Sequence, residues 1–139
     1  MQIKSMLMIS LLFIMSQACY GAACDIRNTL VVDFASYNPF ATQDNDSAGD
    51  IKINCIGIAL LTIEISAGAS GQINQRKMFS NNEALNYNLY SNAGRTTIWN
   101  TLRTLVIGNR IFTIYGRIPA GQDVRPGVYT DNPTVTLYF

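Results

Sequence analysis

The sequence contains no histidine among its 139 residues. Histidine is the commonest general base in catalysis and the commonest metal ligand, and it activates the nucleophile in Ser–His and Cys–His enzymes. Its absence excludes these arrangements. The chain also lacks the Gly-Lys-Ser/Thr ending of a phosphate-binding loop and the GxGxxG pattern of a dinucleotide site. We therefore predict that the protein is not an enzyme and that it uses neither a metal ion nor a cofactor.

Charge is scarce and balanced in this chain. Charged residues make up 14% of the sequence, and the formal net charge is +1. Removal of the leader described below takes Lys4 away, which reduces ten basic residues to nine and makes them equal to the nine acidic residues. A neutral chain with scattered charges gives no electrostatic reason to expect nucleic acid or an anionic membrane as a partner.

One acidic cluster raises the alternative of a calcium site. The segment "DNDSAGD" brings Asp44, Asp46 and Asp50 close together in the sequence, and Ca²⁺ prefers such oxygen ligands. The segment lacks the spaced Glu and the fixed glycine of an EF-hand loop. We therefore interpret it as a polar turn.

The only long apolar run in the sequence lies at the N-terminus. There "MQIKSMLMISLLFIMSQACYGAAC" combines Lys4, about ten apolar residues from Met6 to Met15, and small residues that end at Ala22 and Ala23. This order is typical of a secretory signal peptide, and the run is well short of the ~20 residues that span a bilayer. We assign residues 1–23 to the signal and residues 24–139 to one exported domain without a membrane span.

Three cysteines lie at positions 19, 24 and 55. Cys19 falls within the predicted signal, so the mature chain keeps two cysteines in an oxidising compartment. A disulfide between Cys24 and Cys55 would close a loop of about thirty residues and would stabilise the fold by about 3–4 kcal/mol. Lipidation at Cys19 is the alternative, but the Leu usually found three residues before such a cysteine is missing.

Beyond residue 25 the apolar residues recur at every second position. Such alternation is typical of strands that bury one face, and the clusters of Gly, Asn, Asp, Ser and Pro between the runs are typical of turns. The segment "TTIWNTLRTLVIG" has some helical character, which its β-branched residues weaken. We therefore predict a single all-β domain, a sandwich. The predicted strands are "NTLVVDF" (28–34), "GDIKINC" (49–55), "LLTIEIS" (60–66), "ALNYNLYS" (84–91), "RIFTIYGRI" (110–118) and "TVTLYF" (134–139), and the predicted faces are Ile51, Ile53 and Cys55, then Leu61, Ile63 and Ile65, then Leu85, Tyr87 and Leu89.

Several motifs occur in a characteristic order along the mature chain. They are "CDIRNTLVVDFASYNPF", "GDIKINC", "RKMFSNNEALNYNLYSNAGRTTIWN", "YGRIPAGQ" and "PGVYTD", followed by the strand "TVTLYF". The ordered set resembles the spore coat protein U domain family, which includes the subunits of archaic chaperone–usher pili in Gram-negative bacteria. We interpret the glycines and prolines of residues 113–131 as the shaped connection between the last two strands. The signature residues in it are Tyr115, Gly116, Arg117, Pro119, Gly121, Gln122, Gly127 and Tyr129.

The resemblance implies an immunoglobulin-like sandwich that lacks its final strand. A periplasmic chaperone fills the resulting hydrophobic groove during transit, and the N-terminal extension of a neighbouring subunit fills it in the fibre. An outer-membrane usher is the third implied partner, and the implied location is a fimbrium at the cell surface. The last predicted strand has Val135, Leu137 and Phe139 on one face, and we predict that these residues bind the partner strand or the chaperone.

Two departures from the family pattern concern the start of the domain. At most one or two residues separate the predicted cleavage site from Cys24, whereas subunits of this kind normally carry a donor segment there. We therefore expect a subunit that accepts a strand without donating one, as at the tip of a fibre. In addition, Ala35 stands where the family often has Gly, and it would be strained if that position requires a positive φ angle.

The apolar segment "CIGIALLTIEI" (55–65) is a third departure, because the family usually has a polar turn there. We predict a hairpin whose tip carries Ile56, Ile58, Leu60 and Leu61. These residues either form an adhesive contact surface or pack into the core, and we favour the core.

The alternative function for the whole protein is a stand-alone periplasmic or secreted sandwich that binds a ligand or carbohydrate through "NEALNYNLYSN".

Overall fold

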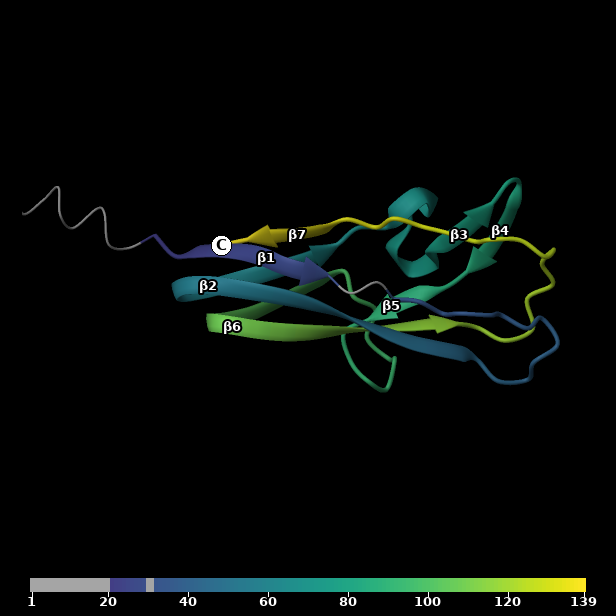
Figure 1. Ribbon diagram of the computed structural model, residues 1–139, viewed down its shortest axis with the longest axis horizontal. Coiled ribbons are helices and arrows are strands. Elements are labelled where there is room, and N and C mark those ends of the chain that lie inside the picture. The colour runs from purple at the N-terminus through teal and green to yellow at the C-terminus, as the bar shows by residue number, and fades with distance from the viewer. Residues whose placement is uncertain (1–20, 30–31) are drawn as a thin grey trace, which may run out of the picture.

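The computed structural model describes residues 21–29 and 32–139, so most of the predicted signal, with Cys19, lies outside it. Over these ranges no helix is long and apolar enough to cross a membrane. The regular elements of the described chain are strands, apart from two short 3₁₀ helices (Figure 1). The elements are β1 (Ala23–Thr29), β2 (Asn45–Ile65), η1 (Gly68–Ser70), η2 (Ile73–Gln75), β3 (Lys77–Ser80), β4 (Glu83–Asn86), β5 (Asn88–Tyr90), β6 (Thr101–Ile118) and β7 (Val135–Tyr138).

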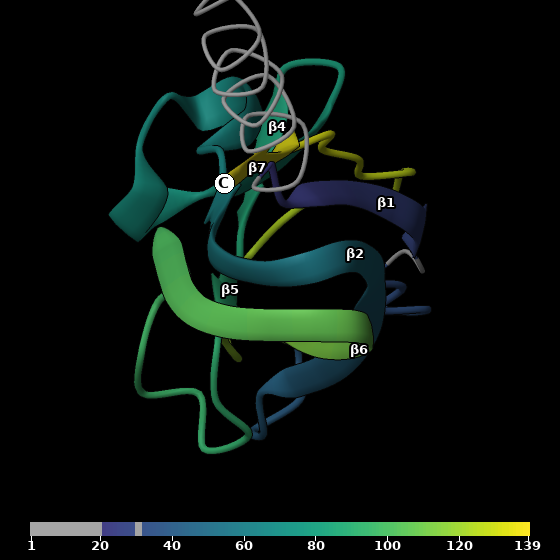
Figure 2. The same ribbon diagram turned by 90° about the vertical axis from the view of Figure 1, so that its left-hand side faces the viewer.

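The antiparallel pair of β2 and β6 forms the framework of the molecule. A straight strand of the 21 residues in β2 would extend ~70 Å at the usual rise per residue. The pair instead bends where its register shifts between Cys55 and Ile58, and Gly57 and Gly108 adopt positive φ angles of 80° and 66° there. Both ribbons run to the left-hand end of Figure 1 and return, and Figure 2 shows them crossing that end. We call this bend, residues 55–60 and 105–108, the corner.

Because of this bend, the two halves of the β2–β6 pair form two layers that pack against a common core. Ile51 and Ile53 come from the first half of β2, Leu61 and Ile63 come from the second half, and all four are at most 1% exposed within one hydrophobic cluster. β1 pairs with the first half of β2, β7 pairs with the second half, and β5 pairs with the end of β6. A second sheet consists of β3 and β4. The predicted all-β, two-sheet fold is confirmed.

The predicted alternation and the predicted disulfide are also confirmed. The three faces expected to be buried are at most 6% exposed throughout, because each alternates with outward-facing residues on a half-buried strand. Cys24 and Cys55 form a disulfide between directly paired residues of β1 and β2. This bond fixes the first strand of the domain beside the corner.

The structure corrects the predicted strand boundaries. Residues 55–65 form no separate hairpin, because β2 continues through the bulge at Ile56 and Gly57 while its pairing with β6 resumes at Ile58. The described first strand is Ala23–Thr29, residues 30 and 31 lie outside the described ranges, and Val32 and Phe34 belong to no strand. Tyr87 separates β4 from β5, since its backbone N–H donates to the carbonyl oxygen of Arg76. The segment with helical character instead begins β6.

A buried arginine joins the second sheet to the framework. Arg76 is 0% exposed, and its Nε donates to the carbonyl oxygen of Ser66 at 2.9 Å. Nη1 donates to Asn88 Oδ1, and Nη2 donates to the carbonyl oxygens of Ile65 and Trp99, each at 2.8 Å. Burial lowers the pKa of Arg76. The four hydrogen bonds satisfy a charge that would otherwise be very unfavourable in this core.

Candidate binding groove

A cavity of about 950 Å³ opens between two segments that are distant in the sequence. One wall is residues 32–39, which follow β1, and the other is residues 124–132, which precede β7. Both walls lie in the right-hand half of Figure 1. Within the described chain, β1 and β7 each pair only with β2, so each keeps one edge without a strand partner. We call this cavity the groove.

The groove is lined largely by apolar side chains. Val32, Phe34 and Tyr37 on one wall and Val124 and Tyr129 on the other are half-buried and pack against the core. These walls are irregular segments. Their hydrogen bonds run mainly to side chains, apart from the reciprocal backbone pair between Thr130 and Phe79 of β3. An apolar hollow bordered by incompletely paired backbone suits a ligand that supplies both apolar side chains and backbone hydrogen-bonding groups.

Signature residues of the segment 113–131 hold the groove walls together. The Tyr37 hydroxyl donates to the carbonyl oxygen of Pro119 at 3.1 Å and accepts from the backbone N–H of Gln122 at 2.9 Å. The Gln122 side chain exchanges two hydrogen bonds, of 2.9 and 2.8 Å, with the backbone of Asn86. Gly121 turns the chain with a φ of 75°. The network therefore joins the first wall, β4 and the connection after β6.

Gly116 provides the closest packing beneath the first wall. A Cβ atom at this position would lie 2.6 Å from Cζ of Phe34 and 2.7 Å from Cγ1 of Val32. Real Cβ atoms do not come this close to other carbons, so any side chain at Gly116 would displace the wall. The wall rests on β6 because this residue has no side chain.

Ion pairs surround the opposite face of the same strand. Arg117 donates to both carboxylate oxygens of Asp46, at 2.7 and 2.8 Å, and Nε of Arg95 lies 3.4 Å from Asp46. The Arg95 guanidinium also lies over the Tyr115 ring, 5.6 Å from its centroid. The hydrogen bond from Arg117 holds the pKa of Asp46 below its usual value. In the described ranges no three metal-ligating side chains gather, and Asp44 also lies within 3.4 Å of Arg117.

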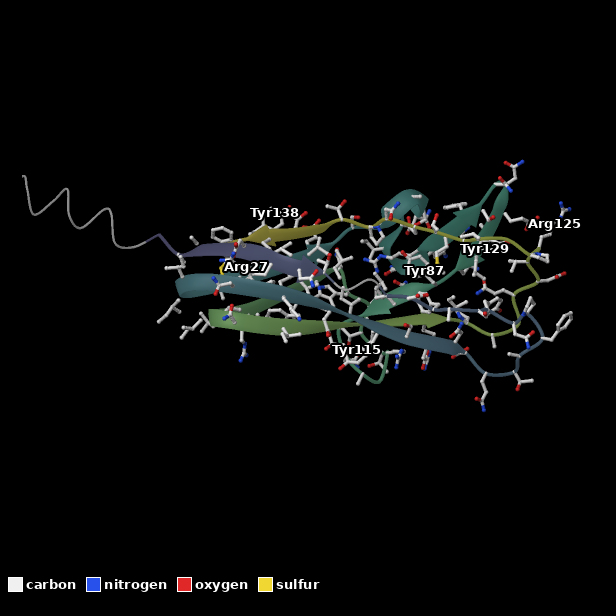
Figure 3. The ribbon with its side chains drawn as sticks, viewed as in Figure 1. Arg27, Tyr87, Tyr115, Arg125, Tyr129 and Tyr138 are labelled. Carbon is white, nitrogen blue, oxygen red and sulfur yellow. A yellow bond between two sulfur atoms is a disulfide. The ribbon has the colours of Figure 1, made fainter. Side chains whose placement is uncertain are left out.

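The second wall is held by two tyrosines and a glycine. The Tyr129 hydroxyl donates to the carbonyl oxygen of Arg125 at 2.7 Å, and Gly127 lies against the Ser80 hydroxyl. Below the wall, the Tyr87 hydroxyl donates to Asp131 at 2.6 Å, and burial raises the pKa of Tyr87. Figure 3 shows Tyr87, Tyr129 and Arg125 in the right-hand half of the molecule, with Arg125 at the end opposite Arg27.

The structure places the predicted partner-binding residues beside the groove. Val135 pairs with Ile65 and Leu137 with Ile63, and both side chains are half-buried against the core. Phe139 is 60% exposed. None of the three lines the groove, which begins upstream of β7. Their role in binding a strand remains a prediction.

Sequence reasoning missed the walls themselves. Val32, Phe34 and Tyr37 were interpreted as parts of a strand and a turn, and Val124 as part of a connection. The available signal was the density of apolar and aromatic residues in "VDFASY" and "DVRPGVY", which exceeds what two exposed turns need. Ala35 in the first wall has a φ of 52°, so this position has the positive φ angle on which the expected strain depends.

The corner carries the residues of the predicted apolar tip. Ile56, Ile58 and Leu60 are 72%, 68% and 48% exposed, whereas Leu61 is 0% exposed. The favoured packing of these side chains into the core is therefore wrong for the first three and right for Leu61. Alternation resumes after the bulge, so the odd-numbered residues of β2 face the core and the even-numbered ones face outward.

The fold and the groove define a class: an all-β, disulfide-linked domain with an apolar groove beside two single-edged strands. A family model described as the Spore Coat Protein U domain matches residues 11–136. The chain belongs to this family, which confirms the resemblance found in its motifs.

Two comparisons with individual proteins agree with this membership. Protein U of Myxococcus xanthus is 26% identical to the chain over 141 residues, which cover 86% of the chain and 79% of that protein. The crystal structure of the CsuC–CsuE chaperone–tip adhesion subunit pre-assembly complex, from archaic chaperone–usher Csu pili of Acinetobacter baumannii, is similar with a TM-score of 0.62 and 22% identity. The alignment covers 86% of this chain and 40% of the matched chain, so this likeness concerns the fold.

Proposed function

We propose that the protein is an exported subunit of a chaperone–usher surface fibre or a coat-like surface assembly, and that it assembles when a strand from a partner fills the groove. The observation that carries this proposal is the apolar cavity between the segment that follows β1 and the segment that precedes β7, two strands that each keep one edge without a strand partner. An added strand would pair with exposed backbone and place alternate side chains in the groove. It would also cover edges that otherwise favour aggregation.

The proposed partners follow from this mode of assembly. A periplasmic chaperone would occupy the groove before export, an outer-membrane usher would receive the subunit, and a neighbouring subunit would supply the strand in the fibre. Membership of the Spore Coat Protein U domain family supports this proposal, as does the fold shared with a tip adhesion subunit that was crystallised with its chaperone. The proposed location is the cell surface, reached through the periplasm.

We further propose that the subunit lies at the tip of a fibre. Ala23 and Cys24 already pair with Ile56 and Cys55 inside the domain, so the chain from Ala23 onward is not free to act as a donor strand. Mass spectrometry of the exported protein tests this proposal. A mature N-terminus at Ala23 or Cys24 is the expected result, and a terminus ten or more residues upstream would restore a donor segment and contradict it.

We also propose that the corner is a contact surface of this tip, because Ile56, Ile58 and Leu60 face solvent. The alternative of a binding site on "NEALNYNLYSN" is not favoured. Leu85, Tyr87 and Leu89 are buried there, and Asn86 is bonded to Gln122.

The strand proposal is tested with the purified full chain and a short synthetic peptide in which Val alternates with Thr. The matched control peptide has Asp in place of each Val. The first peptide should raise the melting temperature of the chain and suppress its aggregation, and the control peptide should do neither. A chain that is monomeric and stable alone, and indifferent to both peptides, would support a complete binding module instead.

A further inference from the structure

The apolar surface of the corner extends beyond the residues predicted from the sequence. Ile58 pairs with Ile107 and Leu60 pairs with Leu105 across β2 and β6, and Ile107 and Leu105 are 65% and 64% exposed. Directly paired residues point to the same face of a sheet. With Ile56 at the bulge, the corner therefore presents a continuous group of large aliphatic side chains on a convex end of the molecule. Contiguous exposed apolar groups of this kind usually mark an interaction surface.

Positive charge collects beside this apolar group. Arg103 precedes Leu105 by two residues on the same face of β6, and Arg110 follows the corner on that strand. Lys52 lies across from Ile111, which is itself 62% exposed. None of these three cations forms an ion pair with a described residue, although the four other arginines that keep some solvent exposure all do. Those four are Arg27, Arg95, Arg117 and Arg125.

Among the described residues, no acidic side chain near the corner forms an ion pair with these cations. Asp25 is paired with Arg27 at 3.2 Å, and Glu64 is half-buried opposite Thr101. Asp44 and Asp46 are engaged by Arg117, close to the start of β2. The near balance of ten basic and nine acidic residues therefore conceals an uneven distribution, in which cations without an ion-pair partner lie near highly exposed aliphatic side chains.

We propose that the corner binds the surface of an anionic phospholipid bilayer. Ile56, Ile58 and Ile107 would enter the interface between headgroups and acyl chains, while the cations would lie among the phosphate groups. Long basic side chains suit this arrangement because their aliphatic stems follow apolar surface while their charged ends stay in the polar layer. A charge-free apolar surface would not use the cations, and a purely polar anion would not use the aliphatic side chains.

This inference rests on the proposed function, because a fibre tip would carry the corner to a membrane. The position of the corner fits that role. Ala23 of β1 pairs with Ile56, so β1 begins beside the corner, whereas the groove lies toward the opposite end. The groove walls include no residue of the corner, so a strand seated between residues 32–39 and 124–132 would leave Ile58 and Ile107 uncovered.

The test is co-sedimentation of the full mature chain with vesicles. Vesicles of equal parts phosphatidylcholine and phosphatidylglycerol should bind the chain on the order of tenfold more tightly than vesicles of phosphatidylcholine alone, since each nearby cation strengthens binding several-fold. This preference should shrink as salt is added. Equal binding to the two kinds of vesicle, or no binding to either, would overturn the proposal.

Variants separate the two components of the surface. Ile58→Ser combined with Ile107→Ser should abolish vesicle binding, and Arg103→Gln combined with Arg110→Gln should remove the preference for phosphatidylglycerol. Phe40→Ser and Arg125→Gln are matched controls outside the corner, where the side chains are 93% and 85% exposed. Both controls should bind vesicles like the unmodified chain. Equal losses in the controls would contradict a corner-specific site.

Two further measurements keep the outcomes distinct. Sedimentation velocity in the presence of the Val-Thr peptide should show that the chain is monomeric with or without the corner substitutions; a dimer that Ile58→Ser and Ile107→Ser dissolve would assign the corner to a second copy and overturn the proposal. Uptake of the Val-Thr peptide is measured on the same samples. Failure of vesicle binding with intact peptide uptake refutes only the membrane inference, whereas failure of peptide uptake refutes the proposed function.

Discussion

The groove and the corner are both apolar surfaces, yet the chain builds them in opposite ways. The groove is a hollow between two irregular walls, fixed by hydrogen bonds such as those of Tyr37 with Pro119 and Gln122. The corner is a convex bend of two regular strands, and its side chains, such as Ile58 and Ile107, are exposed to solvent and do not belong to the core. Shape and surroundings, more than apolar content, therefore decide what each surface can bind.

The difference has an energetic consequence that the following predictions exploit. Substitutions of buried residues that support the groove walls should lower the free energy of unfolding and weaken strand binding, because the walls depend on buried contacts. Substitutions at the corner should leave the fold intact, because surface changes away from such contacts usually alter the free energy of unfolding by less than about 0.5 kcal/mol.

The largest change in the free energy of unfolding is expected at the buried Arg76, which joins the second sheet to the β2–β6 framework. Arg76→Met would leave three carbonyl groups and the Asn88 side chain without their donors, and should lower the free energy of unfolding by about 3–5 kcal/mol. Arg103→Met at the corner is the matched control and should change it by less than about 0.5 kcal/mol. Urea denaturation measures both values, and equal effects would abolish the contrast between the two regions.

A smaller loss in the free energy of unfolding is expected at Gly116, where the first wall packs on β6. Gly116→Ala would force Phe34 and Val32 away, at a cost of about 1–3 kcal/mol in the free energy of unfolding, and should weaken uptake of the Val-Thr peptide. Gly57→Ala at the corner should cost about 1–2 kcal/mol, because φ is positive there. It should not weaken peptide uptake. Thermal unfolding and peptide titration of both variants test the difference, and a groove indifferent to Gly116→Ala would contradict it.

The tyrosine beneath the second wall should make stability depend on pH. Burial, with the hydrogen bond to Asp131, raises the pKa of Tyr87 above its ordinary value of 10.0, so its stabilising contribution is complete below about pH 10 and is lost as the pH rises through the folded-state pKa. Tyr87→Phe should cost about 1–2 kcal/mol near neutral pH and should flatten the alkaline decline. Denaturation curves recorded from neutral to alkaline pH measure this, and an unchanged slope would exclude Tyr87 as the cause.

The smallest change is expected from Ala35→Gly in the first wall. Relief of the left-handed strain at a φ of 52° should outweigh the extra freedom of the unfolded chain and raise the free energy of unfolding by up to about 1 kcal/mol. Differential scanning calorimetry would register a small rise in melting temperature. A fall would show that the Ala35 side chain contributes contacts that exceed the strain.

The sequence was most informative where local periodicity decides the structure. The faces of Ile51 and Ile53, and of Leu61 and Ile63, followed from alternation because a strand with one buried face must repeat every second residue. The disulfide followed from two cysteines in an exported chain. The connection after β6 was recognised by its glycines and prolines, and its role as a scaffold agrees with the contacts of Gln122.

The remaining features depend on contacts between segments that are far apart in the sequence, and local periodicity does not predict such contacts. The continuation of β2 past Gly57 depends on pairing with β6, fifty residues later in the chain. The groove exists because residues 32–39 and 124–132 meet at a distance that no local pattern specifies. The burial of Arg76 does not follow from the sequence, because arginines usually lie at the surface and only the folded chain brings four acceptors around this one.

Hydrogen exchange along the backbone, with and without the Val-Thr peptide, tests the strand-accepting groove most directly. The proposed function predicts that saturating peptide slows exchange of amides in β7 and in residues 124–132, and leaves the amides of the corner at residues 56–58 unchanged. The Asp-containing control peptide should have no effect at either place. Unchanged exchange in β7 and residues 124–132, or protection confined to the corner, would contradict the proposal that this subunit is completed by a partner's strand.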